Sequence, residues 1–234
     1  MAHEPMSRRK LLSNSSRLAA GGALALGVAS MPTAAFARRR GPAPVTRNNN
    51  DIAVLNYALT LEHLEAAFYV QGVAAFTDGD ISSYLSNAGF GPAVSTNAYA
   101  RIVDVRDHEV THVNTLISVI QSLGGTPIPS CVFDFSAAYG DVATFLATSQ
   151  VLEDTGVRAY TGALALITSP DLQTAGATIA TVEARHASFF RTLTQLNPFP
   201  AAFDMPESPT EIINQVLATG FVVSCPVTPP TPGA

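Results

Sequence analysis

Glu109-Val110-Thr111-His112 and Glu183-Ala184-Arg185-His186 repeat one pattern, a glutamate followed three residues later by a histidine. Residues three apart lie on the same face of a helix, so each pair can direct a carboxylate and an imidazole at one point. The surrounding apolar residues recur at helical spacing, and they are Ile102, Val105, Val113, Leu116 and Ile120 for the first pair and Ile179, Val182, Phe190 and Leu193 for the second. Both pairs are therefore expected on helix faces that point into a core.

Two further stretches carry a matching pattern of glutamate and tyrosine. Tyr69 follows Glu62 by seven residues, and Tyr160 follows Glu153 by seven. Seven residues make two helical turns, so each glutamate shares a helix face with its tyrosine. The two halves of the chain thus repeat one order, glutamate with tyrosine and then Glu-x-x-His. This repetition favours Glu62 as the counterpart of Glu153, and Glu65, one turn away, is the alternative.

Most glutamates of the chain fall on or near apolar helix faces, at Glu62, Glu65, Glu109, Glu153 and Glu183. Burying several carboxylates together without partners costs many kcal/mol, so cations must balance them. The only lysine of the chain is Lys10, and few arginines fall in the predicted helices. Bound metal ions are the simplest source of positive charge. Protonation, or pairing with Arg106, Arg158 and Arg185, is the alternative.

The pattern of apolar residues and chain breaks predicts an all-α fold. No stretch alternates at period two over the length of a strand. Four long helices are expected over residues 51–71, 97–123, 138–168 and 170–196, and Gly72, the Gly124-Gly125 pair and Ser169-Pro170 mark ends. A short helix is expected around Ile81–Leu85, and Ser208-Pro209-Thr210-Glu211 starts another in the C-terminal extension, residues 197–234.

The connection between the second and third long helices is about 15 residues, which can span about 50 Å at about 3.3 Å per residue. A helix of 26 residues is about 39 Å long. The connection can therefore cross the whole bundle and leave these two helices parallel. We predict a four-helix bundle over residues 51–196 with a long crossover.

The first 37 residues have the pattern of an export signal. Arg8-Arg9-Lys10 precedes the uncharged stretch Leu18–Met31, and Ala35-Phe36-Ala37 supplies small residues for cleavage. The arginine pair resembles a twin-arginine signal, with an ordinary signal peptide as the alternative. An exported protein, periplasmic or extracellular, is predicted. No stable membrane insertion is expected after cleavage, and residues 38–50 read as a flexible leader.

Removal of that signal makes the chain more acidic. It takes away four of the 13 basic residues and one of the 18 acidic residues, which leaves nine against 17 and a formal charge of −8. Nucleic acid and anionic membrane surfaces are therefore poor partners. The two cysteines, Cys131 and Cys225, fit either a disulfide in an oxidising compartment or two unpaired thiols.

The order Glu, Glu-x-x-His, Glu, Glu-x-x-His on four helices resembles the ferritin-like superfamily of di-iron and di-manganese carboxylate proteins. The run from Leu55 to Tyr69, Leu-Asn-Tyr-Ala-Leu-Thr-Leu-Glu-His-Leu-Glu-Ala-Ala-Phe-Tyr, is more specifically similar to a secreted ferritin-like group that includes desiccation- and stress-related proteins. The resemblance implies that two glutamates bridge two metal ions and that each ion gains one histidine and one terminal glutamate. By this reading the bridging pair is Glu109 and Glu183, the histidines are His112 and His186, and the terminal pair is Glu62 and Glu153.

The expected function follows from this ligand set. Oxygen and nitrogen ligands suit iron or manganese, and we expect redox chemistry on O₂, peroxide or Fe²⁺. Tyr69 and Tyr160 are the candidate catalytic residues, as hydrogen-bond donors to the ligands or as electron carriers, with core packing as the alternative. A non-enzymatic stress- or desiccation-related protein is the other function, and a homo-oligomer is compatible with either. His63 and His108 are expected to point about 100° away from the ligands that they neighbour, as surface residues or as residues that support the ligands from outside the centre.

Overall fold

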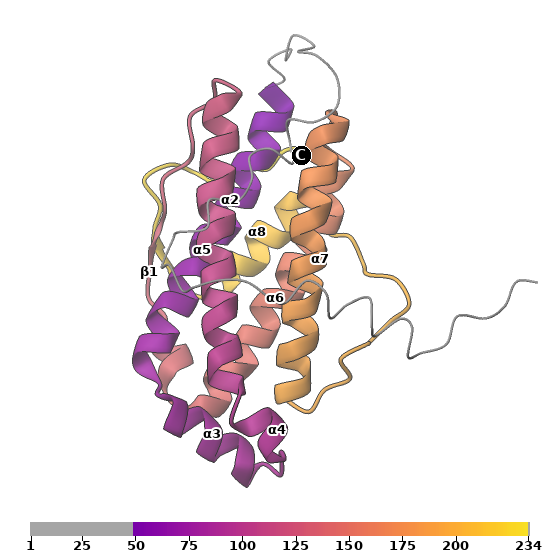
Figure 1. Ribbon diagram of the computed structural model, residues 1–234. Helices are drawn as coiled ribbons and strands as arrows, with labels where there is room; N and C mark the ends of the chain where they lie inside the picture. Colours follow the sequence, from indigo (N-terminus) through magenta and orange to yellow (C-terminus); the bar gives the residue numbers. More distant parts are fainter. Residues whose placement is uncertain (1–48, 234) are drawn as a thin grey trace, which may run out of the picture. The chain divides into compact units, whose positions relative to one another are not determined.

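The computed structural model describes residues 49–233, and four long helices form a bundle within them (Figure 1). They are α2 (Asn49–Ala75), α5 (Ala98–Ser122), α6 (Val142–Leu164) and α7 (Pro170–Leu193). Helix α2 packs against α5 and α6, and α6 packs against α7. The chain between α5 and α6 runs back along the bundle, so the predicted all-α bundle with a long crossover is confirmed. The expected signal and leader, residues 1–37 and 38–50, lie outside the described residues except for the last two.

The end of α2 differs from the prediction. Gly72 was expected to end this helix, but the helix continues to Ala75. A Cβ atom on Gly72 would lie 2.4 Å from Cε2 of Phe145. The glycine therefore permits close contact between α2 and α6, and the prediction of a helix end at this position was wrong.

Helix α6 is shorter at both ends than its predicted range. It begins at Val142 because the Asp141 side chain accepts a hydrogen bond from Thr144 N–H (2.7 Å), while the 3₁₀ turn η2 (Ser136–Tyr139) precedes it. After it ends, Thr168 N–H donates to Asp51 Oδ1 (2.8 Å). Buried Asp51 thus ties the turn between α6 and α7 to α2.

The connection from α2 to α5 contains two short helices where one was predicted, α3 (Asp78–Asn87) and α4 (Pro92–Ser95). Thr77 caps α3, since its side chain accepts a hydrogen bond from Asp80 N–H and the Asp80 carboxylate accepts one from Thr77 N–H. Buried Ile81 and Leu85 join α3 to the main core.

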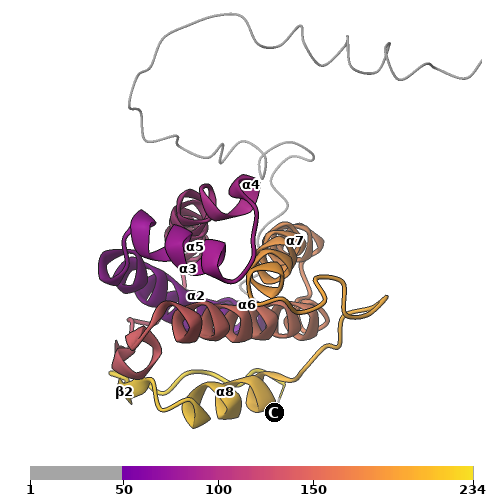
Figure 2. The same cartoon turned by 90° about the horizontal axis from the view of Figure 1, so that it is seen from below.

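The C-terminal part of the chain packs on the outer side of α6. Figure 2 shows helix α8 (Pro209–Ala218) beside α6, and the short helix predicted here is confirmed. Strand β2 (Val222–Ser224) pairs antiparallel with β1 (Val132–Phe133) in the crossover. A disulfide joins Cys131 to Cys225. The sequence did not predict these strands, which are too short to show an alternating pattern.

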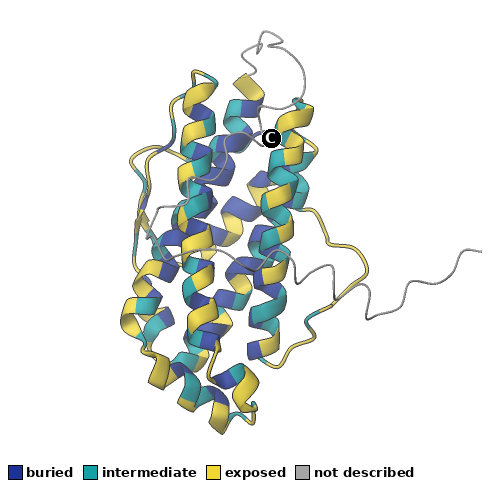
Figure 3. Ribbon diagram, viewed as in Figure 1, coloured by how far each residue is buried: buried dark blue, intermediate teal, exposed yellow. Residues whose placement is uncertain are grey.

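Burial follows the bundle geometry. Figure 3 shows buried residues on the inward faces of the four long helices and exposed residues on the outward faces. Aromatic rings gather in the core around Phe68, which contacts Tyr69, Phe135 and Phe145. Within residues 49–233 no helix is both long and apolar enough to cross a membrane.

Candidate metal centre

All six predicted ligands meet in the interior of the bundle. Helix α2 contributes Glu62, α5 contributes Glu109 and His112, α6 contributes Glu153, and α7 contributes Glu183 and His186. The four carboxylates have no exposed surface, and the two histidines are also buried. Their spacing along each helix places them on the buried face, as the sequence pattern required.

The cluster divides into two overlapping groups with the composition of metal sites. One consists of Glu62, Glu109, His112 and Glu183, and the other of Glu109, Glu153, Glu183 and His186. Within each group one candidate ligand atom per residue lies within 4.8 Å of all the others. Glu109 and Glu183 belong to both groups, so the two groups share a pair of carboxylates.

The two imidazoles face the carboxylates in similar ways. His112 Nδ1 lies 3.2 Å from Glu62 Oε2, 3.1 Å from Glu109 Oε2 and 3.2 Å from Glu183 Oε1. His186 Nδ1 lies 3.0 Å from Glu109 Oε1 and 3.2 Å from Glu153 Oε2. Each Nδ1 atom therefore points to the centre of its own group.

Several of these buried atoms have no hydrogen-bond partner despite such short separations. They are Glu109 Oε1, Glu153 Oε2, both carboxylate oxygens of Glu183, and His186 Nδ1. Buried polar atoms are normally paired, because an unpaired one loses its hydration without compensation. Carboxylate oxygens and imidazole nitrogens that converge without hydrogen-bond geometry fit the donor set of a bound cation. The residues present therefore fit a metal centre.

Arginine does not supply the balancing charge. Arg106 pairs with Asp107 (2.7 Å) and Arg158 with Glu207 (3.0 Å), while Arg185 is exposed. Among the described residues, ion pairs with the cluster carboxylates come only from the two histidines. The arginine alternative is therefore excluded, and protons and metal ions remain.

Burial and mutual repulsion alter the pKa values of the cluster carboxylates. Burial raises the pKa of Glu62 to about 7. It raises the pKa of Glu183 well above the ordinary range, and the nearby Glu109 carboxylate adds to the effect. For Glu109 burial acts in the same direction, but the nearby imidazoles of His112 and His186 outweigh it and lower the pKa to about 2. Without metal, the cluster therefore retains protons on some carboxylates at neutral pH.

The pKa values of the two imidazoles shift in the direction opposite to that expected from burial alone. Burial disfavours the charged form of His186, but the nearby carboxylates of Glu153 and Glu109 raise its pKa to about 10. The Glu62 carboxylate and its neighbours likewise raise the pKa of His112 far above its ordinary value, against the effect of burial. A metal ion must displace these protons in order to bind.

The two predicted tyrosines donate hydrogen bonds across the bundle to Glu62 and Glu153. Tyr69 of α2 donates to Glu153 Oε1 of α6 (2.5 Å), and Tyr160 of α6 donates to Glu62 Oε1 of α2. Burial raises the pKa of both hydroxyl groups well above 10. Both tyrosines therefore keep their protons and act as donors, each to the glutamate of the other half of the repeat.

Glu65 is buried beside the cluster but belongs to neither group. Burial, and then the charge of Glu183, raise its pKa well above the ordinary value. A Cβ atom built on Gly156 would lie 3.2 Å from Glu65 Oε1 and 3.1 Å from Glu183 Oε2. Gly156 thus leaves the space that these carboxylates use. The sequence analysis missed Gly156, although it follows Glu153 by three residues as Glu65 follows Glu62.

The other two helix histidines differ from each other. His63 is half-buried, and its Nε2 lies 3.2 Å from the carbonyl oxygen of Ile128. His108 is exposed, yet its Nδ1 lies 2.9 Å from Nε2 of His186, and the two rings are nearly parallel. The sequence analysis did not identify this contact.

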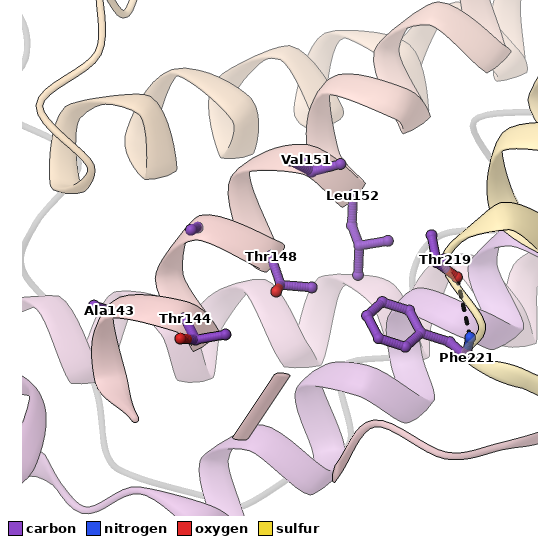
Figure 4. Close-up of a pocket in the computed structure, with 8 residues that line it drawn as sticks. Ala143, Thr144, Thr148, Val151, Leu152, Thr219 and Phe221 are labelled. Carbon is purple, nitrogen blue, oxygen red and sulfur yellow. Dashed lines mark hydrogen bonds between the residues drawn. The ribbon is translucent and has the colours of Figure 1, made fainter. Parts of the chain in front are cut away.

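One surface groove lies away from the cluster, on the outer side of α6. It has a volume of about 530 Å³ and is lined by Ala143, Thr144, Ala147, Thr148, Val151, Leu152, Thr219 and Phe221 (Figure 4). A second groove of about 340 Å³ lies between α2 and α5, with His63 and Asn114 in its lining. None of the six clustered residues lines either groove.

Comparison with known families agrees with this geometry. The model of the ferritin-like domain family matches residues 50–196, more than half of the chain. The matched region contains all four long helices of the bundle except for the first residue of α2. No curated protein gives a significant match.

Proposed function

The chain belongs to the ferritin-like domain family, and from this premise we propose that it is an exported di-metal carboxylate protein. We further propose that its reaction is redox chemistry on O₂, peroxide or Fe²⁺. The observation that carries the proposal is the pair of four-residue groups that share Glu109 and Glu183. Two ions are the simplest occupants of two groups with two common carboxylates.

The proposed ligands are assigned by group. Glu62 and His112 would hold one ion, Glu153 and His186 would hold the other, and Glu109 and Glu183, which belong to both groups, would hold both. Glutamate and histidine in this proportion suit iron or manganese. Six protein ligands for two ions leave coordination positions for a small molecule. When bound, the ions supply the electrons or the Lewis acidity of the reaction.

The surrounding side chains prepare the centre for this chemistry. Tyr160 orients Glu62 and Tyr69 orients Glu153 through buried hydrogen bonds, which limits the positions that the terminal carboxylates adopt. These two buried hydroxyl groups make the shortest hydrogen bonds to Glu62 and Glu153. We propose them as the catalytic residues, which would hold the ligand carboxylates by hydrogen bonds or carry an electron to the metal ions.

Export is part of the proposal. The signal pattern in residues 1–37 and the Cys131–Cys225 disulfide both suit an oxidising compartment such as the periplasm or the exterior. A twin-arginine route carries folded proteins, which allows the metal to be acquired before export. We propose no nucleic-acid partner, and self-association is compatible with the proposed reaction.

The test combines metal analysis with two reactions. Protein expressed with its own signal is analysed for iron and manganese, and then assayed for Fe²⁺ oxidation and peroxide consumption. We expect two ions per chain and activity that the Glu109→Ala variant loses, while the exposed control Glu211→Gln keeps it. Negligible metal with silent assays would refute the proposal.

One observation favours a second function, a stress- or desiccation-related protein that uses the bundle structurally. The two grooves described above do not include any cluster residue in their linings, and the C-terminal segment, joined to the crossover by the Cys131–Cys225 disulfide, packs on α6. The His112→Ala variant separates the two functions. If the wild-type protein catalyses neither reaction and His112→Ala greatly lowers its thermal stability, the centre is structural.

A further inference from the structure

The two halves of the centre repeat each other in sequence but differ at one neighbouring position. Glu109 and His112 on α5 correspond to Glu183 and His186 on α7. His108 stands directly before Glu109, whereas Val182 stands directly before Glu183. A histidine can accept or donate a hydrogen bond, and a valine side chain can do neither. The repeat therefore breaks at a residue that adjoins the ligands.

His108 contacts the ring of His186, a proposed metal ligand, at the nitrogen Nε2. Its Nδ1 lies 2.9 Å from Nε2 of His186, on the side of that ring opposite to Nδ1. His186 Nδ1 faces Glu109 and Glu153. For His186 Nδ1 to offer its lone pair to a metal ion, the neutral ring must carry its proton on Nε2. That proton then points at His108 Nδ1, which accepts it in a hydrogen bond.

The other imidazole has no such partner. All hydrogen-bond and ion-pair contacts of His112 within the described chain involve its Nδ1, and its side chain keeps 11% exposure. Its Nε2 is not among the buried unpaired atoms, and no described residue contacts it as His108 contacts Nε2 of His186. The ring of His112 is therefore less firmly held than that of His186.

We propose that His108 is a positioning residue that makes the two metal positions unequal. It fixes the tautomer and orientation of His186, so the ion held by Glu153 and His186 binds more tightly than it would without His108. The ion held by Glu62 and His112 does not depend on His108. This inference rests on the proposed di-metal centre. A hydrogen-bond partner behind a ligating histidine typically changes metal affinity by about 10- to 100-fold.

Three variants isolate the hydrogen bond. His108→Val copies the residue of the other half of the repeat, and His108→Ala is a second variant without an acceptor. His108→Asn places a carbonyl oxygen near the position of Nδ1 and so keeps the acceptor. Because His108 is exposed, all three should fold, and equal unfolding temperatures of the metal-free proteins check this.

The measurement is titration of metal-free protein with Mn²⁺ by calorimetry, followed by anomalous diffraction at the manganese edge with substoichiometric Mn²⁺. We expect His108→Val and His108→Ala to weaken one of two binding steps by about 10- to 100-fold, with occupancy lost beside His186 and kept beside His112. His108→Asn should restore most of the affinity.

Two kinds of failure can be told apart. If the wild-type protein binds no pair of Mn²⁺ ions, the proposed centre itself is refuted. If it binds two ions but His108→Val changes neither step, or weakens both equally, the role of His108 alone is refuted. Failure of His108→Asn to restore the step would also overturn the account, because the acceptor would then not be the relevant feature.

Discussion

Loading the metal-free protein with Mn²⁺ at pH 7 should release protons. His112 and His186 each hold a proton at this pH, since nearby carboxylates raise the pKa of His186 to about 10 and that of His112 further still. Burial also raises the pKa of Glu183 well above its ordinary range. Burial raises the pKa of Glu62 to about 7, so this carboxyl is about half protonated. Ligands bind metal in the deprotonated form. We therefore expect at least two protons per pair of ions.

The same reasoning gives the direction of the pH dependence. Glu62 is mostly protonated at pH 6 and mostly ionised at pH 8, because its pKa is about 7. The number of protons released should therefore fall by about one between these two pH values. The apparent affinity for Mn²⁺ should rise over the same range, because fewer protons compete with the ion.

The assay is calorimetric titration in two buffers that differ in ionisation enthalpy, which gives the proton count directly. An indicator dye at low buffer concentration provides an independent count. The exposed Glu211→Gln variant is the matched control and should release the same number. Binding of two ions with release of fewer than one proton would refute the account, because the ions would then not displace the protons of this cluster.

Four further perturbations test separate parts of the structure. The metal-free protein should lose stability as the pH rises from 5 to 8. Because the pKa of Glu62 is raised to about 7 in the folded protein, this carboxyl contributes about 3 kcal/mol to the free energy of unfolding below pH 4.5, and the contribution is lost as the pH rises through 7. Chemical unfolding at several pH values measures this loss. Tyr160→Phe should weaken Mn²⁺ binding by about tenfold or more without unfolding the protein, as calorimetry would show, since Glu62 loses its donor. Gly156→Ala should likewise weaken Mn²⁺ binding, because its Cβ would crowd Glu183 Oε2 at 3.1 Å. This loss is expected even though alanine favours the helix by about 1 kcal/mol. Unchanged affinity would show that this space is not needed. Reduction of the Cys131–Cys225 disulfide, or Cys131→Ala, should lower the free energy of unfolding by about 2–5 kcal/mol, measured by thermal unfolding with and without reductant.

The sequence predicted the bundle and the clustering of six side chains because both follow from periodicity. A carboxylate and an imidazole three residues apart on an apolar stripe must face the core together. Repetition of the pattern on alternate helices then leaves one interior point at which they can meet. The choice of Glu62 over Glu65 followed from the same repetition, and the structure places Glu62 in a four-residue group and Glu65 outside it.

Features that depend on contacts between helices could not be read from periodicity. A glycine at position 72 looks like a helix end, and only the nearby ring of Phe145 shows that it serves close packing. The position of His108 around the axis of α5 does not predict its contact with the ring of His186, which belongs to α7. Each tyrosine was predicted on the same helix face as the glutamate seven residues before it, and only the structure shows that its hydroxyl donates to the glutamate of the other helix.

Anomalous diffraction from crystals of the protein purified with its own metal tests the central claim most directly. The account predicts two peaks inside the bundle, one beside Glu62 and His112 and the other beside Glu153 and His186, with Glu109 and Glu183 contacting both. Absence of any anomalous peak, with the same carboxylates and imidazoles joined to one another only by hydrogen bonds, would contradict it.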